Sequence, residues 1–132
     1  MISFLINNRF VIMRNTFNKK ESITEKKIIK KLFSDGKNIN ILPLHVKHLT
    51  VNKESYSSSR ILIVVSKNNV KSSVKRNLIK RRIRESYRLN KNILRNLSFL
   101  IAFVYNSDKV FDYSKVQESV IKVLNKLKKL DD

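Results

Sequence analysis

The spacing of apolar residues predicts a first helix over residues 22–34. Ser22 and Glu25 form an S-x-x-E capping box at its start. Gly36 follows the helix, and we expect it to adopt the left-handed conformation with which many helices end. The apolar positions that recur at helical spacing are Ile28, Ile29, Leu32 and Phe33.

Three other stretches have the patterns of strands: residues 41–51, 61–65 and 98–105. The first stretch alternates between two faces, and we expect His48 within it to be a surface residue of the strand. The other two are apolar runs typical of buried strands. The polar residues 52–59 predict a hairpin loop between the first two strands.

Two further helices complete the predicted order. Residues 70–95 contain no Gly or Pro and form the longest predicted helix, with Asn69 as its cap. Its apolar face, which we expect to anchor the helix on the sheet, consists of Ile79, Ile83, Tyr87 and Leu94. Ser114 and Gln117 make a second capping box, which opens the last helix. The apolar stripe of this last helix consists of Val116, Val120, Val123, Leu124 and Leu127.

The order α-β-β-α-β-α predicts a single α+β domain, an α/β sandwich with helices packed on a sheet of about four strands. No repeat, linker or low-complexity tract divides the chain. Residues 1–13 are apolar, but the run is too short to span a bilayer, and we expect a disordered N-terminal extension there. Residues 14–132 then form the domain.

Charge changes this picture more than size does. The chain has 132 residues, of which 42% are hydrophobic, enough for an ordinary core, yet its formal net charge is +19. Self-repulsion on that scale favours a polyanionic partner. The absence of Cys excludes a disulfide scaffold, a thiolate zinc site and a cysteine nucleophile, and favours a reducing, cytoplasmic location.

The positive charge is concentrated in the longest predicted helix. Residues 67–95 contain eleven basic residues and one acidic residue, Glu85. A basic row at i, i+4 spacing is formed by Arg76, Lys80, Arg84 and Arg88. Arg binds phosphate in bidentate fashion and stacks on bases, so RNA is the favoured partner.

Three other interpretations of this helix compete with RNA binding. A solvated surface helix would carry interspersed Glu and a row dominated by Lys. Duplex DNA would require a helix-turn-helix or a dimeric basic region, and here predicted strands flank the helix. A membrane surface would require a wide apolar face opposite the charge. We therefore expect neither DNA nor a membrane as partner.

Residues 66–88 closely resemble the signature of the bacterial ribonuclease P protein subunit. In that family a Ser-Lys pair ends a strand, and the next helix carries Arg-Asn-Arg-x-Lys-Arg followed by Arg-Glu. The matching positions here are Ser66, Lys67, Arg76, Asn77, Lys80, Arg81, Arg84 and Glu85. The chain departs from the pattern at Leu78, where the family usually has Arg, and at Asn68, where Lys is common.

The resemblance implies a left-handed crossover between parallel strands and a role in a ribonucleoprotein. In that role the protein assists a catalytic RNA in removing the 5′ leader from precursor tRNA. The RNA subunit holds the catalytic Mg²⁺ ions, so no catalytic or metal-ligating residue is expected in the protein. The expected partners are the catalytic RNA and precursor tRNA.

Two sets of site residues follow as expectations. The residues expected to bind RNA are Ser66, Lys67, Lys71, Lys75, Arg76, Asn77, Lys80, Arg81, Arg84 and Arg88. A groove for the single-stranded leader should combine charge with apolar platforms, and Phe17 and Phe33 are its candidates, together with the exposed face of the strands. Phe33 fits the core equally well.

A structural RNA-binding protein, such as a small ribosomal protein, shares the charge and size of this chain and is the alternative function. The segment from Ser66 to Glu85 discriminates between the two, because its pattern is that of the ribonuclease P subunit.

Overall fold

Four strands form one mixed sheet, in the spatial order β3 (Lys37–Ile41), β4 (Leu44–Thr50), β6 (Phe99–Tyr105) and β5 (Arg60–Val65). The computed structural model describes residues 2–6, 9–13, 21–56 and 58–130. The pairs β3–β4 and β4–β6 are antiparallel, whereas β5 pairs with β6 in parallel. The α+β class and the four-stranded sheet are therefore confirmed.

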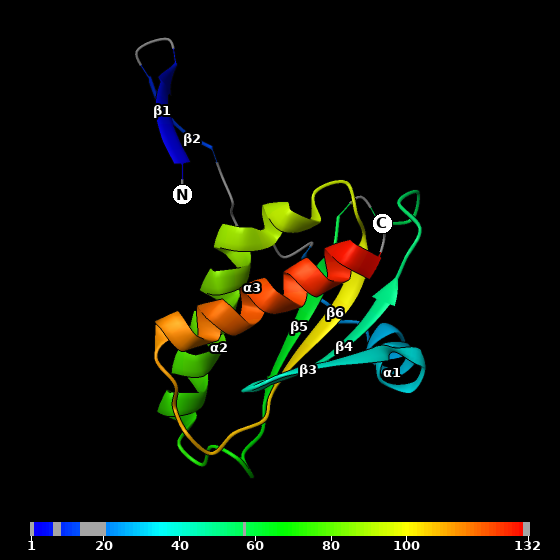
Figure 1. Ribbon diagram of the computed structural model, residues 1–132, viewed down its shortest axis with the longest axis vertical. Helices are drawn as coiled ribbons and strands as arrows, with labels where there is room; N and C mark the ends of the chain where they lie inside the picture. Colours follow the sequence, from blue (N-terminus) through cyan, green and yellow to red (C-terminus); the bar gives the residue numbers. More distant parts are fainter. Residues whose placement is uncertain (1, 7–8, 14–20, 57, 131–132) are drawn as a thin grey trace.

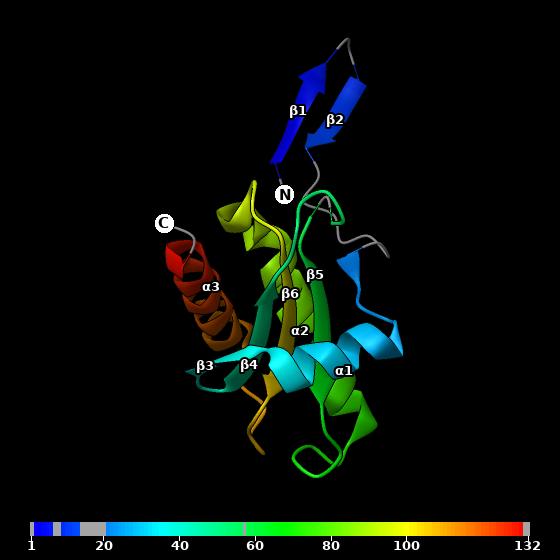
Figure 2. The ribbon, with the colours of Figure 1, turned by 90° about the vertical axis from the view of Figure 1, so that its right-hand side faces the viewer.

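Three α-helices cover the sheet from both sides (Figures 1 and 2). They are α1 (Lys26–Asp35), α2 (Ser73–Asn90) and α3 (Tyr113–Leu130), and a short 3₁₀ helix, η2 (Lys91–Leu94), follows α2. The larger core lies between the sheet and the pair α2–α3, and a smaller core lies between the sheet and α1. In Figure 2, α3 and α1 stand on different sides of the strands.

The central strand β6 contributes to both cores. Phe99, Ile101 and Phe103 belong to the core beneath α2 and α3, whereas Leu100 and Ala102 belong to the core beneath α1. Six of its seven residues are buried. This explains why the strand reads as an uninterrupted apolar run rather than as an alternating one.

The connections between strands differ from the prediction in two places. The edge strand β3 is an additional element, and its residues show no strand pattern because only Ile39 of the five is buried. Residues 52–59 are not a hairpin loop, because β6 lies between β4 and β5. The chain instead passes from β5 through α2 to the parallel strand β6. The left-handed sense of this crossover stays a prediction.

The predicted capping residues are wrong at all three helices. Helix α1 begins at Lys26, because Ser22 forms a parallel bridge with Ile61 and the chain is still extended there. Helix α2 is capped by Ser72, whose hydroxyl accepts a hydrogen bond from the Lys75 N–H, and not by Asn69. At α3, Asp112 accepts from the Lys115 N–H at 2.9 Å. The caps of α2 and α3 belong to the favoured capping residue types, whereas Glu25 before α1 forms no capping hydrogen bond with its side chain.

The predicted apolar faces of α2 and α3 are confirmed. Ile79, Ile83, Tyr87 and Leu94 are buried, as are all five residues of the α3 stripe. Helical periodicity fixes which side chains share a face, even where the helix starts at a different residue than predicted.

Gly36 ends α1, but its φ is −68°, so the predicted left-handed conformation is wrong. Its N–H donates to the Leu32 carbonyl at 2.9 Å, and a Cβ at this position would lie 2.2 Å from the same oxygen. Glycine is therefore required because the Leu32 carbonyl of the last helical turn leaves no room for a Cβ.

His48 is buried, with 4% of its surface exposed, so its predicted surface position is also wrong. It shares a face of β4 with the buried Leu44 and Val46, and its ring packs edge-on against Phe99. Burial, reinforced by the positive charge of Lys37, lowers the pKa of His48.

A separate hairpin, made of β1 (Ile2–Ile6) and β2 (Arg9–Met13), lies within the N-terminal extension, whose division from the domain at residue 13 stays a prediction. Ile2 pairs with Met13 and Ile6 with Arg9. Both runs are rich in β-branched and aromatic residues, and two residues separate them, the length of a tight hairpin connection. Figures 1 and 2 show the hairpin set apart from the four-stranded sheet.

Replacing Gly36 with Ala should destabilise the protein by about 1–3 kcal/mol, because the new methyl group meets backbone atoms that cannot rotate away. We expect Tm in a thermal melt to fall by at least about 3 °C. Ser34→Ala, an exposed change in the same helix, is the control. An unchanged Tm for Gly36→Ala would contradict the close approach.

Deleting residues 1–12 should leave folding intact, because β1 and β2 pair with each other and not with the four-stranded sheet. We expect Tm to change by less than about 2 °C. A larger fall would show that the hairpin packs on the domain.

Candidate RNA-binding interface

The turn between β5 and α2 is organised by Ser66. Its carbonyl accepts from the Val70 N–H at 3.0 Å, and its hydroxyl accepts from the Asn69 N–H at 3.3 Å. The Asn69 side chain in turn donates to the Tyr105 carbonyl at the end of β6. Lys67 is exposed at the tip of this turn. The Ser-Lys pair of the sequence motif therefore combines a residue that shapes the turn with a solvent-exposed cation.

Arg76 is tied to the backbone just before α2. One of its terminal nitrogens, Nη1, donates to the carbonyls of Val70 and Lys71, at 2.8 Å each. These bonds fix the entry of the chain into the helix and leave the guanidinium half-buried. The first residue of the predicted basic row thus has a structural role in addition to its charge.

The cations of α2 lie on a face that adjoins its buried face, as the helical wheel predicts. Ile79, Ile83 and Tyr87 point into the core. The predicted RNA-binding residues that are exposed are Lys67, Lys71, Lys75, Asn77, Arg81 and Arg84, and those that are half-buried are Ser66, Arg76, Lys80 and Arg88. The structure brings this set together on one turn and one helix. Their individual roles stay predictions.

Arg88 ends the basic row in an ion pair with Glu85. The Arg88 Nε lies 3.1 Å from Glu85 Oε2, and a second contact joins Nη2 to Oε1. The hydrogen bond to Arg88 lowers the pKa of Glu85 and raises that of Arg88. This carboxylate is the only acidic group in α2, and Lys80 and Arg84 are the cations in the middle of the row.

Lys80 and Arg84 line a small groove along the outer edge of β5. The groove has a volume of about 160 Å³, and its other walls are Ser22 and residues 61–63 of the strand. Residues 22–23 pair with Ile61, where the Ile23 N–H donates to the Ile61 carbonyl at 2.8 Å. Apart from Lys80 and Arg84, the lining of this groove therefore consists of one Ser and three apolar residues.

The face of the sheet beneath α1 is the candidate surface for binding a single strand. Phe33 stands on α1 with 37% of its surface exposed, whereas its neighbour Leu32 is fully buried. Phe33 is therefore not a core residue, and its role as a platform stays a prediction. Val64 and Val104 are neighbours in the β5–β6 register and are half-buried on this face. Phe17 lies outside the described residues.

The described residues contain no group of three or more His, Asp or Glu side chains arranged to hold a metal ion. Within the same part of the chain, no helix is long and apolar enough to cross a membrane.

One contact near this interface could not have been found in the sequence. Glu21 is buried, and its carboxylate lies 2.8 Å from Lys91 Nζ at the end of α2. The pair joins residues 70 positions apart. The sequence around a single Glu before a predicted helix contains no pattern that identifies its ion-pair partner.

A basic helix that crosses between two parallel strands of a mixed sheet places the chain among small α+β RNA-binding proteins. Over residues 17–128 the chain matches the family model described as Ribonuclease P. The chain belongs to the ribonuclease P protein family, and the predicted resemblance is confirmed.

Curated relatives agree with this membership. The ribonuclease P protein component of Porphyromonas gingivalis strain W83 is 34% identical over 102 residues, which cover 73% of this chain and 74% of the relative. That of Petrotoga mobilis is 32% identical over 120 residues, covering 85% of this chain and 95% of the relative. These relatives support the ribonuclease P assignment, and none of them favours the ribosomal alternative.

Solved structures share the fold. A Staphylococcus aureus RNase P protein mutant with defective mRNA degradation activity aligns with a TM-score of 0.72 at 27% identity, covering 83% of this chain and 90% of that structure. The Thermotoga maritima RNase P protein aligns with a TM-score of 0.69 at 22% identity, covering 80% and 96%. The arrangement of helices and strands is therefore that of the family.

Removing one cation from the basic row should lower the salt dependence of RNA binding. Each phosphate contact contributes about 0.7–0.9 to the slope of log affinity against log salt, so Lys80→Ala and Arg84→Ala should each flatten the slope by about that amount. The measurement is a filter-binding titration with the cognate ribonuclease P RNA.

Lys128→Ala is the matched control, because Lys128 is an exposed cation near the end of α3, away from the row. We expect a much smaller change of slope for this variant. Equal changes for Lys128→Ala and Arg84→Ala would refute the assignment of the site.

Proposed function

We propose that this chain is the protein subunit of a ribonucleoprotein endonuclease that removes the 5′ leader from precursor tRNA. The protein binds the catalytic RNA through α2 and grips the leader on the sheet face beneath α1. The observation that carries the proposal is the basic row of α2, seated on the parallel crossover of a ribonuclease P fold.

The geometry of α2 supports phosphate binding by this row. Lys80 and Arg84 lie side by side along the helix, one turn apart, and successive phosphates of a nucleic acid offer a comparable line of negative charge. Contacts of this kind position an RNA without reading its sequence. Such phosphate contacts suit a protein whose partner RNA is already folded.

The leader is a single strand, and its binding requires surfaces that accept any base. Phe33 offers an aromatic platform, and the half-buried Val64 and Val104 offer apolar contacts on the same side of the sheet. Lys47 lies on this face of β4, where it pairs with Ala102 of β6, and adds positive charge. Stacking combined with charge is the usual basis of sequence-tolerant single-strand binding.

The chemical step belongs, in this proposal, to the RNA subunit and the Mg²⁺ ions that it holds. The described part of the chain does not bring together a donor set that would hold Mg²⁺, so we derive no step through a metal bound by the protein. The protein contributes affinity and position, and the ribonucleoprotein acts in the cytoplasm, where tRNA is made in bacteria.

Purified protein should restore cleavage of precursor tRNA by the cognate RNA at low Mg²⁺ concentration, and should not cleave precursor tRNA alone. The reason is that bound cations replace part of the Mg²⁺ that the RNA otherwise needs to offset its own charge. The measurement is 5′-leader release on a gel.

RNA alone and protein alone at the same Mg²⁺ concentration are the controls for this experiment. Mg²⁺-dependent cleavage by RNA-free protein would overturn the proposed mechanism, and a failure to stimulate the RNA would favour the structural RNA-binding alternative.

A further inference from the structure

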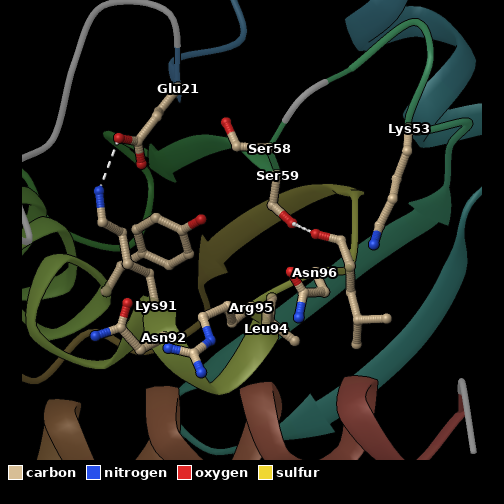
Figure 3. Close-up of a pocket in the computed structure, with 11 residues that line it drawn as sticks. Glu21, Lys53, Ser58, Ser59, Lys91, Asn92, Leu94, Arg95 and Asn96 are labelled. Atoms are coloured by element: carbon tan, nitrogen blue, oxygen red, sulfur yellow. Dashed lines mark hydrogen bonds and ion pairs between the residues drawn. The ribbon is translucent and has the colours of Figure 1, made fainter.

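A polar pocket of about 540 Å³ lies at the far end of α2, beyond the basic row (Figure 3). It is enclosed by η2, by the turn that leads into β6 and by the residues before β5. Its size is that of pockets that hold small molecules in other proteins. No residue of this pocket belongs to the predicted site.

Three cations surround the pocket. In Figure 3, Lys91 and Lys53 stand at opposite ends, and Arg95 lies between them. The one acidic group of the lining, Glu21, is neutralised by Lys91 at 2.8 Å. Within the described part of the chain, Lys53 and Arg95 form no ion pair. The pocket therefore holds a surplus of positive charge that no described side chain offsets.

The remaining lining suits a nucleotide better than a bare anion. Asn92 and Asn96 present amide groups, which can both donate and accept hydrogen bonds. The half-buried Leu97 supplies apolar surface, and the buried Tyr87 and Leu94 lie at the floor of the pocket. A bound nucleotide would contact each part of this lining. Its phosphate would lie beside the cations, its base would pack on the apolar surface, and the amides would bond the edge of the base.

The turn that carries these groups is held in an uncommon conformation. Asn96 has a φ of 70°, in the left-handed region that Asn tolerates better than most residues. The turn is closed on both sides of Asn96, because the Arg95 N–H donates to the Asn92 carbonyl and the Leu97 N–H to the Leu94 carbonyl. Arg95 and Asn96 are thus fixed at the pocket before any ligand binds.

The pocket also continues the surface of the basic row. Lys80, Arg84 and Lys91 follow one another at intervals of four and seven residues, which places them along one side of the helix. Glu21 lines the pocket and Ser22 lines the groove beside Lys80 and Arg84, so the two depressions adjoin the same short segment. An RNA strand bound along the row would reach the pocket.

We propose that this pocket binds one nucleotide of single-stranded RNA, with its phosphate held by Lys53 and Arg95. The inference rests on the proposed RNA-binding function and adds a second contact at the opposite end of α2 from the Ser66 turn. The nucleotide belongs either to the catalytic RNA or to the leader, since both present the same chemistry.

The test is an NMR titration of the ¹⁵N-labelled full chain with a uridine tetranucleotide. We expect the amide signals of Asn92 and Asn96 to shift with the tetranucleotide and not with uridine, which has no phosphate. The double variant Lys53→Ala/Arg95→Ala should weaken this binding by about tenfold or more, because it removes two charge-assisted contacts.

The matched control is Lys128→Ala/Lys129→Ala, which removes the same charge from exposed positions of α3. We expect it to weaken binding by less than about threefold, the effect of a distant surface charge. Thermal melts of both double variants verify folding. Equal weakening by the two variants, or unshifted Asn92 and Asn96 signals, would overturn the proposal.

Two longer RNAs identify the source of the nucleotide. Weaker binding of the Lys53→Ala/Arg95→Ala variant to the ribonuclease P RNA alone would assign the pocket to that RNA. A loss confined to precursor tRNA that carries its leader, in complex with the RNA, would assign it to the leader. The NMR test contains neither of these long RNAs and involves no cleavage. The pocket proposal and the proposed function can therefore be refuted independently of each other.

Discussion

The packing of α2 against the β5–β6 pair is the constraint on which the rest of the structure depends. Ile79, Ile83 and Tyr87 are buried there, and Tyr87 meets Phe103 of β6 edge to face. Each such side chain contributes about 1.5–3 kcal/mol on burial, whereas each like-charge pair along the basic row costs about 0.2–0.5 kcal/mol. The apolar face therefore outweighs the repulsion, and a helix unfavourable in isolation is stable on this sheet.

The few acidic groups near α2 orient individual cations and leave the helix with a net positive charge. Glu85 engages Arg88 within the helix, and Glu21 engages Lys91 from the segment that pairs with the edge of β5. Burial and the charge of Glu21 both raise the pKa of Tyr87, which keeps its hydroxyl protonated beside this pair. One acid thus orients the end of the row, while the other ties the N-terminal segment to the helix.

The periodicity of apolar residues predicted the elements that have one buried face. It did not predict the features that depend on which strands pair with each other. The apolar stripes of α2 and α3 follow from spacing alone. Strand β3 did not, because four of its five residues are not buried. Composition could not show that β6 inserts between β4 and β5, or that Ser22 pairs with Ile61 rather than capping a helix. The motif placed the cations of the site, but Glu21 and its partner are distant in sequence.

The same geometry limits what this surface can recognise. Lys and Arg contacts to phosphates carry no base information, and apolar platforms such as Phe33 accept any base. A row of cations fixed on a rigid helix does impose a spacing and a direction on the strand that it binds. If α2 binds RNA as proposed, selectivity arises from the shape of the folded RNA that packs against the helix. In the proposed function, the protein adds affinity to a partner RNA that positions the substrate, and it tolerates variation in the sequence of the strand that it binds.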